Sequence, residues 1–462
     1  MPISQKKIPL VGAMPHASRA GMEPRMKGRR AAAAALFTLG MLVTVLLPAT
    51  DAQAAPPTPS PDAAMLVNVP PENNCAEMKE VLKELAERGD KRGIICHEER
   101  TPSKALRSKA RELVEALAEP IPFPSWCIDN ATGNWEFWHR RLACQYRDNQ
   151  VEILYAWRNN VLQEVGRAWL VLADLAAINP NDPTWQHQQQ IIPFRLEGQA
   201  SAGMTVAGGF SCEGWCLYGG QNYSRQPLAI NTVVQGVRDF FTTVSTSGQV
   251  GEITTRLDVA FGKPGFVFTP VQVFAPKVRC DNAVPGVTTV GCVFPQYIPT
   301  MDYSLSGPYP GLARHLQKAQ ESGLPGAPGG LPLNRMTDET LRDRNGTTAC
   351  PAAWPRPNGL DCDEYPFRST VQGAYTAWSY TPDNPATPPR RPWPARTHDG
   401  CGSPAPPVPV FTPGVDPTSP NGYSVCFIPL AQNRGGGAAL NANLYVAERV
   451  INGDAFYVEI LP

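Results

Sequence analysis

Two patterns of apolar residues divide the chain into a short helical part and a longer strand-rich part. Apolar residues recur at helical spacing from Met78 to Ala86 and again from Leu106 to Leu117, which predicts two amphipathic helices. After Pro120 the pattern changes to short runs of alternating apolar and polar residues, separated by Gly, Asn and Pro. These runs predict strands at 150–157, 167–175, 190–198, 256–261 and 266–274. Such short strands with turn signals are typical of an antiparallel sandwich-like domain.

A third region starts near Tyr303 and mixes helical with extended patterns. In chain order it predicts a helix at 311–322, an extended segment before Pro366, a strand ending near Leu430, a helix from Ala438 and a strand at 455–461. The predicted organisation is therefore a signal region (1–55), a linker and helical segment (56–118), a β-rich accessory domain (119–302) and an α+β domain (303–462).

The first 55 residues have the pattern of a secretory signal. Arg29 and Arg30 precede the apolar run 31–47, and the small residues at 52–55 supply a cleavage site. A membrane anchor is the alternative, but a run of 17 residues is at the short limit for crossing a bilayer. The sequence therefore predicts a secreted, extracellular protein with no integral membrane segment after signal removal.

Composition and charge limit the possible partners. With 42% hydrophobic and 18% charged residues over 462 positions, the chain is expected to fold into two or three domains. The net charge is zero, but without residues 1–55 the rest holds 34 basic and 39 acidic residues. A net-acidic body is not steered as a whole toward nucleic acid. Any phosphate binding must therefore come from a local patch or a bound metal ion.

All 12 cysteines follow residue 55, and an even number in an exported chain predicts six disulfides. A zinc site is the alternative for the close pair Cys212 and Cys216, but no histidine lies near at ligand spacing. The spacing favours pairs in chain order: Cys75 with Cys96, Cys127 with Cys144, Cys212 with Cys216, Cys280 with Cys292, Cys350 with Cys362, and Cys401 with Cys426.

The acidic segment DCDEYP is the first candidate for chemistry. Because Pro366 disfavours a helix before it, the segment is expected to be extended, with side chains alternating between two faces. Asp361 and Asp363 then share one face and can converge on a metal ion or a water, while Glu364 points to the other face. Acidic pairs on a protein surface are common, so a plain solvated pair is the alternative.

The second candidate is the run QNRGGG at 432–437, between a predicted strand and a predicted helix. Glycines let a backbone approach a ligand closely, and a helix N-terminus offers amide groups to a phosphate. Asn433 can supply an oxygen to a hard cation, and Arg434 a bidentate grip on phosphate. A flexible glycine turn capped by the asparagine is the structural alternative.

Taken together, these segments resemble a known family. CDEYPFRST, GYSVCFIP, QNRGGG and RVINGDAFYV, with ARHLQKAQ and LNRMTDETLRDRN before them, are similar to the NucA/NucB family of secreted deoxyribonucleases, especially its multidomain actinobacterial members. The resemblance covers about the last 160 residues. It implies a ββα-metal fold that hydrolyses DNA with little sequence preference, using a divalent metal ion, Mg²⁺ or Mn²⁺.

The resemblance also implies roles for individual residues. Asp363 matches the family's general base, with Glu364 beside it in a structural or supporting role, and Asn433 is the metal-side residue. Glu448 is the nearest candidate for a metal-binding carboxylate further along the helix. Arg434, Gly435 and Gly436 are the expected substrate contacts.

Three further positions bear on activity. Gln372 and Gln432 stand where the family tends to have acids, and both are candidates for weakening metal binding. His315 matches a family position, but a single histidine on an amphipathic helix is more often packed or capping. Neither His315 nor His398 is assigned as the base.

The sequence therefore predicts a secreted metal-dependent non-specific DNA endonuclease. The alternative from another class is a secreted protein whose β-rich domain binds a cell-wall or matrix polymer, with an inactive nuclease-like domain. An exported toxin with the same chemistry is a third possibility.

Overall fold

The computed structural model describes residues 75–117, 123–129, 132–218, 223–268, 270–376, 394–401 and 408–462. The predicted signal region and Pro-rich linker lie outside the described residues. Within those ranges no helix is long and apolar enough to cross a membrane. The described residues all belong to one compact unit, Pro61–Pro462.

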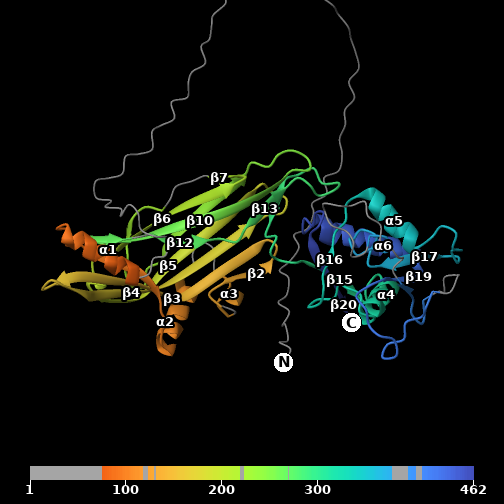
Figure 1. Cartoon of the computed structure of the whole chain (residues 1–462), viewed down its shortest axis with the longest axis horizontal. Helices are drawn as coiled ribbons and strands as arrows, with labels where there is room; N and C mark the ends of the chain where they lie inside the picture. Colours follow the sequence, from red (N-terminus) through yellow and green to blue (C-terminus); the bar gives the residue numbers. More distant parts are fainter. Residues whose placement is uncertain are drawn as a thin grey trace, which may run out of the picture. The chain divides into compact units, whose positions relative to one another are not determined.

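The β-rich part consists of two mainly antiparallel sheets around one apolar core (Figure 1). The larger described sheet has the order β11–β1–β3–β4–β5–β9–β7, with β2 on β3, and the smaller has the order β14–β13–β10–β6–β8, with β12 on β10. The strands of the larger sheet are β1 (Gly93–Glu99), β2 (Trp135–His139), β3 (Leu142–Arg158), β4 (Val161–Ile178), β5 (Thr184–Gly198), β7 (Cys216–Tyr218), β9 (Val234–Thr242) and β11 (Phe266–Phe268). Those of the smaller are β6 (Thr205–Gly214), β8 (Gln226–Pro227), β10 (Val250–Gly262), β12 (Val271–Phe274), β13 (Val278–Asp281) and β14 (Gly291–Val293). The predicted β-rich character of this part, with several mainly antiparallel sheets, is confirmed.

The predicted strands at 150–157 and 167–175 are the inner parts of one long hairpin. β3 and β4 turn at Asn159 and Asn160, whose φ angles are 51° and 60°. Asparagine tolerates this left-handed conformation, which a two-residue hairpin turn requires. The predicted run 266–274 instead divides into β11 and β12, which lie in different sheets.

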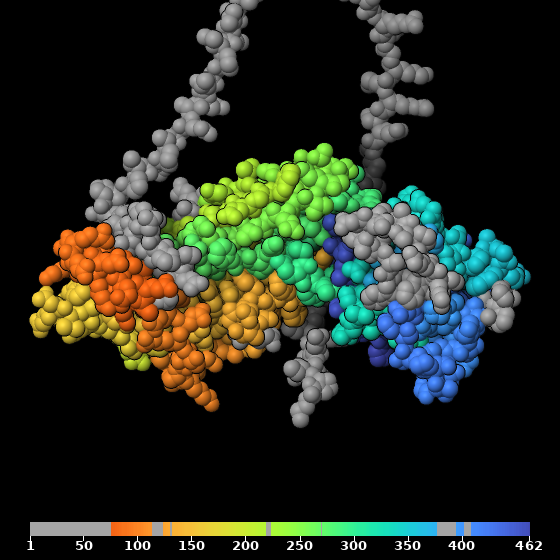
Figure 2. Space-filling model, viewed as in Figure 1, coloured from red at the N-terminus to blue at the C-terminus, as the bar shows by residue number. Residues whose placement is uncertain are grey.

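The two predicted helices are α1 (Cys75–Glu87) and α2 (Lys104–Leu117), and α3 (Ser125–Asp129) follows them. They pack against the larger sheet, and in Figure 2 the orange atoms of this segment lie directly against the yellow atoms that follow in the sequence. Met78 and Leu82 of α1 are buried with Ile94 and Ile153 of the sheet. Because β1 between the helices is itself a strand of that sheet, the helical segment is built into the β-rich part.

The C-terminal domain has its own core and two three-stranded sheets among the described residues. One sheet contains β15 (Thr300–Ser304), β20 (Ala455–Leu461) and β16 (Leu333–Asn334), and the other β17 (Leu360–Tyr365), β19 (Tyr423–Pro429) and β18 (Ala395–Arg396). Its helices are α4 (Pro310–Glu321), α5 (Glu339–Ala349) and α6 (Leu430–Ala439), which continues as a π-helical segment, Leu440–Val446.

All six predicted disulfides form, in chain order. Cys212 and Cys216 are bonded to each other, so the zinc alternative for this pair is wrong. No described cysteine is free. Six disulfides are typical of a chain that folds in an oxidising compartment.

Buried charges join the β-rich part to the C-terminal domain. Arg449, from the C-terminal domain, donates to Asp281 at the end of β13, with Nη2 2.8 Å from Oδ1. Conversely, Arg140 and Arg279 of the β-rich part donate to Asp454 of the C-terminal domain at 3.1 and 2.7 Å. Arg140 and Arg449 are each 1% exposed and Asp281 is fully buried. Because an unpaired buried charge is costly, these reciprocal pairs bind the two domains to each other.

We therefore expect Asp281→Ala to lower the free energy of unfolding by about 3–5 kcal/mol, because it leaves Arg449 buried without its carboxylate. Urea denaturation followed by tryptophan fluorescence measures this change. Glu80→Ala removes an exposed ion pair with Lys83 and is the control, expected to cost at most about 0.5 kcal/mol. Equal effects of the two substitutions would contradict the role given to Asp281.

Candidate functional site

The two segments singled out in the sequence meet in the C-terminal domain. β17 pairs antiparallel with β19, which places Asp363 opposite Cys426. β19 leads directly into α6, which carries Asn433. An antiparallel strand pair followed by a helix therefore brings Asp363 and Asn433 to the same place.

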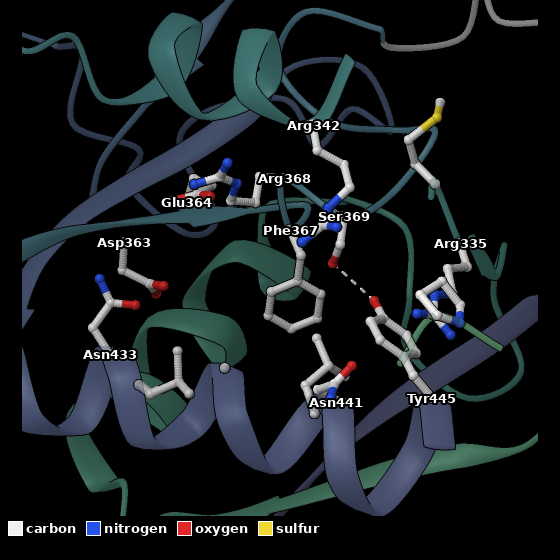
Figure 3. Close-up of a pocket in the computed structure, with 15 residues that line it drawn as sticks. Arg335, Arg342, Asp363, Glu364, Phe367, Arg368, Ser369, Asn433, Asn441 and Tyr445 are labelled. Atoms are coloured by element: carbon white, nitrogen blue, oxygen red, sulfur yellow. Dashed lines mark hydrogen bonds between the residues drawn. The ribbon is translucent and has the colours of Figure 1, made fainter. Parts of the chain in front are cut away.

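Asp363 and Asn433 line one cavity of about 290 Å³. Figure 3 shows the two side chains directed toward each other at one end of this cavity. Beside these two groups, the charged and amide side chains of the wall are Glu364, Asn441, Arg335, Arg342 and Arg368. The cavity thus combines carboxyl and amide oxygens with a strongly cationic wall.

Asp363 is held by a histidine that the sequence analysis did not assign to the site. The carboxylate is 4% exposed, and its Oδ2 lies 2.6 Å from Nδ1 of His315 on α4. A signal for this position exists in the sequence, because His315 lies on the apolar stripe formed by Leu312, Leu316 and Ala319. A polar residue on a buried stripe needs a partner, and the partner here is Asp363.

The hydrogen bonds continue beyond His315. Its Nε2 lies 2.9 Å from Oγ of Ser424, and the same hydroxyl lies 3.1 Å from Nε2 of His398. Burial is the largest cause that lowers the pKa of His398 to about 4, and the nearby charge of Arg396 acts in the same direction. The His398 ring is therefore neutral near pH 7.

Glu364 is half-buried and has a strongly shifted acidity. Withdrawal from water, followed by the charge of Asp363, raises the pKa of Glu364 to about 8. The group is thus mostly protonated at pH 7. Alternation along the strand was expected to separate Glu364 from Asp363, yet both line the same cavity. The reason is that β17 is an edge strand, so side chains from both of its faces border the space along its open edge.

Asp361 does not converge with Asp363, contrary to the expectation from alternation. Two residues along a strand advance about 6.6 Å, which carries Asp361 away from the first cavity. It lines a neighbouring cavity of about 560 Å³ instead, with Arg356, whose Nε lies 3.7 Å from the carboxylate.

The segment predicted as a glycine-rich turn is helical. α6 begins at Leu430, directly after Pro429, so the three glycines lie within the helix and present no helix N-terminus to a phosphate. Asn433 donates from Nδ2 to the carbonyl of Cys362 at 3.0 Å, which ties α6 to β17. This bond leaves the amide oxygen of Asn433 directed at the cavity (Figure 3).

The glycines contribute differently from what was predicted. A side chain at Gly435 would collide with Tyr309, and one at Gly436 would collide with Leu312. These two glycines therefore allow the helix to pack closely on α4 and do not line the first cavity. Gly437 lines it and has open space where a side chain would be.

Arg434 and Glu448 both lie outside the first cavity. Arg434 lines the neighbouring cavity, together with Arg356 and Arg368. Glu448 lies at the domain interface, where its Oε1 accepts from Arg141 at 3.2 Å. Further along the helix, Leu440, Asn441 and Tyr445 line the first cavity, and Asn441 is the one with an amide side chain.

The two glutamines that depart from the family pattern have structural contacts. Gln432 accepts from the amide of Gly311 at 2.6 Å, at the start of α4. Gln372 accepts from the amide of Asn334 at 2.9 Å and also donates to its side chain. Neither glutamine lines the first cavity.

The donors in the cavity fit one kind of cation. No group of three His, Cys, Asp or Glu side chains that could hold a metal occurs among the described residues. The amide oxygens of Asn433 and Asn441 are hard donors. They suit a Mg²⁺ or Mn²⁺ ion that keeps several waters and takes other ligands from a substrate phosphate.

Comparison of the chain with protein-family models, curated proteins and solved structures gives no match.

The shifted acidity of Glu364 predicts how stability depends on pH. Between pH 4.5, the ordinary pKa, and about 8 the folded chain retains a proton that the unfolded chain releases. The free energy of unfolding therefore falls as the pH rises through this window, and Glu364→Gln removes that part of the fall.

Urea denaturation at pH 5 and pH 8 measures this difference. The exposed Glu459→Gln is the matched control and should follow the wild-type pH dependence. Parallel curves for Glu364→Gln and wild type would show that Glu364 is not protonated in the folded chain.

Proposed function

We propose that the protein is a secreted, metal-dependent deoxyribonuclease that hydrolyses internal phosphodiester bonds of extracellular DNA with little sequence preference. The observation that carries the proposal is the meeting of Asp363, held by His315, with Asn433 in a cavity walled by arginines. The resemblance of the same segments to the NucA/NucB family, with its ββα-metal fold, supports the same chemistry.

The arginines suit a phosphodiester anion. Arg335 is 4% exposed, and its guanidinium stacks on the ring of Tyr445 at 4.1 Å. Burial lowers the pKa of Arg335 to about 10, so it stays charged at neutral pH. Arg342 has a buried Nε without a partner among the described groups, and Arg368 is ion-paired with Asp343. With Glu364 largely neutral, this wall favours a bound anion.

Asp363 is the proposed general base. One carboxylate oxygen lies 2.6 Å from Nδ1 of His315, and the carboxylate faces the cavity, where it can take a proton from a water molecule. The water oxygen bonds to phosphorus and the bond to one sugar oxygen breaks. The products are a phosphomonoester and an alcohol, and the released sugar oxygen takes its proton from solvent.

Asn433 and Asn441 are the residues that would hold the divalent ion. When bound, the ion stabilises negative charge on the phosphate and on the departing oxygen. Asn433 has the more defined position of the two, because its amide nitrogen is bonded to the Cys362 carbonyl.

The arrangement of the two cavities supports cleavage within a strand. They share Glu364, Arg368 and Asn433, so they lie on either side of these residues. The neighbouring cavity adds Arg356 and Arg434, which suit a further phosphate of the same polymer. A polynucleotide could thus extend in both directions from the reacting phosphate.

Asp363→Asn is expected to lower the rate of plasmid nicking by about 10²–10⁴-fold, because the amide keeps a hydrogen-bond acceptor for His315 but cannot take a proton. The full exported chain is incubated with supercoiled plasmid in Mg²⁺ or Mn²⁺, and nicked and linear products are measured on gels. Asp399→Asn, an exposed carboxylate outside both cavities, is the control and should match wild type. Intact plasmid with the wild-type chain under both metals would refute the proposal.

Asn433→Ala tests the metal separately. We expect it to raise the Mg²⁺ concentration for half-maximal activity by about 10–100-fold, whereas Asp363→Asn lowers kcat and leaves that concentration unchanged. Titration of Mg²⁺ after chelator treatment measures both quantities. Asn421→Ala, on an exposed loop, is the matched control. An unchanged Mg²⁺ requirement in Asn433→Ala would remove Asn433 from the metal site.

A binding function is the second candidate. Trp215, Leu217, Tyr218 and Phe241 are 44%, 62%, 52% and 42% exposed around β7 and β9, at one edge of the larger sheet. Exposed apolar groups gathered in this way mark interaction surfaces, and aromatic rings suit a wall or matrix polymer. If the plasmid stays intact, cosedimentation with insoluble wall polymer becomes the test of this function.

A further inference from the structure

Four side chains from four segments form one buried chain of hydrogen bonds. Asp363 of β17, His315 of α4, Ser424 of β19 and His398 of the segment 394–401 are 4%, 2%, 0% and 3% exposed. The successive distances are 2.6, 2.9 and 3.1 Å. These groups must therefore satisfy one another's hydrogen bonds without water. Each donor has to face an acceptor, and this restricts where each proton can lie.

The hydroxyl of Ser424 decides the direction of the chain, because it has one proton and faces a ring nitrogen on each side. If Ser424 donates to His315, then His398 must donate from Nε2 to Ser424, and His315 carries its proton on Nδ1. If Ser424 donates to His398, then His315 donates from Nε2 and turns a bare Nδ1 toward Asp363, unless its ring is charged. With a neutral ring, that second pattern requires a protonated Asp363 at a distance of 2.6 Å.

The surroundings of His398 favour the first pattern. Its Nδ1 is buried and has no partner among the described groups. The cationic groups that act on this ring are Arg396 and Lys318, the other titratable neighbour is the ring of His315, and Ser424 is in direct contact. A bare nitrogen is better tolerated next to cationic groups than an N–H without an acceptor. His398 therefore carries its proton on Nε2 and directs it to Ser424.

We propose that Ser424 and His398 are positioning residues that fix the proton of His315 on Nδ1, so that His315 donates to Asp363 and the carboxylate remains ionised. The catalytic consequence rests on the proposed function, because an ionised Asp363 is the form that can take a proton from water. The tautomer itself is a property of the folded chain and can be measured without substrate.

The experiment is NMR of the full exported chain with ¹⁵N-labelled histidine, with His315→Gln and His398→Gln used to assign the rings. The expected result is a protonated Nδ1 and a bare Nε2 in His315, and the opposite pattern in His398. Ser424→Ala should mix the tautomers of His315, whereas Ser424→Thr keeps the hydroxyl and should retain the wild-type pattern. A charged His315, a proton on its Nε2, or no change in Ser424→Ala would overturn the proposal.

Kinetics supply the second measurement. Ser424→Ala and His398→Phe are expected to lower kcat about 3–10-fold, the size of one hydrogen bond, and to change the acidic limb of the pH profile without changing KM for plasmid. Ser424→Thr and His398→Gln should restore the profile, since each retains the donor. Equal losses in the conservative variants would indicate a purely structural role.

The two measurements separate the two proposals. Inactive wild-type protein with the expected His315 tautomer would refute the nuclease and leave the hydrogen-bond chain standing. Active protein with the reverse tautomer would refute only the positioning role.

Discussion

The candidate site depends on one buried hydrogen bond, between His315 and Asp363. A carboxylate that is almost withdrawn from water is unstable as an ion unless a donor compensates it. In the proposed tautomer His315 is that donor, and its contact with Asp363 also holds the rotamer of the carboxylate. The neighbouring Glu364 accepts from the backbone of Arg368, but its burial and the charge of Asp363 outweigh this bond and raise its pKa to about 8. Two adjacent acids on one strand therefore have different hydrogen-bond surroundings.

The rest of the domain holds this pair in place. α4 brings His315, and its first turn is bonded to Gln432 of α6. Gly435 and Gly436 let α6 approach α4 at a distance that any side chain would prevent. Asn433 then ties α6 to the backbone of β17. The glycine run thus serves the site through helix packing, and in the proposed function the arginines of the cavity wall take the phosphate-binding role that was expected of the glycines.

Local patterns in the sequence predicted what depends on local contacts. The disulfides pair near neighbours, and α4 and β17 follow apolar spacing and the position of Pro366. The start of α6 was placed too late, because a run of glycines has low intrinsic helix propensity and only packing on Tyr309 and Leu312 makes it helical. Alternation assigned the faces of β17, but it could not show that the cavity lies along the strand's open edge. The partner of His315 lies 48 residues away, beyond the reach of any spacing argument.

The position of Glu448 shows that the β-rich part affects which side chains reach the candidate site of the C-terminal domain. Glu448 was expected to bind the metal because it lies further along the chain from the helix that carries Asn433. Its carboxylate instead accepts from Arg141 of the β-rich part, at the interface between the two domains. Pro285, from the segment between β13 and β14, also lines the first cavity. The reciprocal ion pairs of Arg449 with Asp281 and of Arg279 with Asp454 keep that segment at the cavity wall. The β-rich part thus contributes one residue to the lining of the candidate site. Any separation of the two domains would both expose buried arginines and open the cavity.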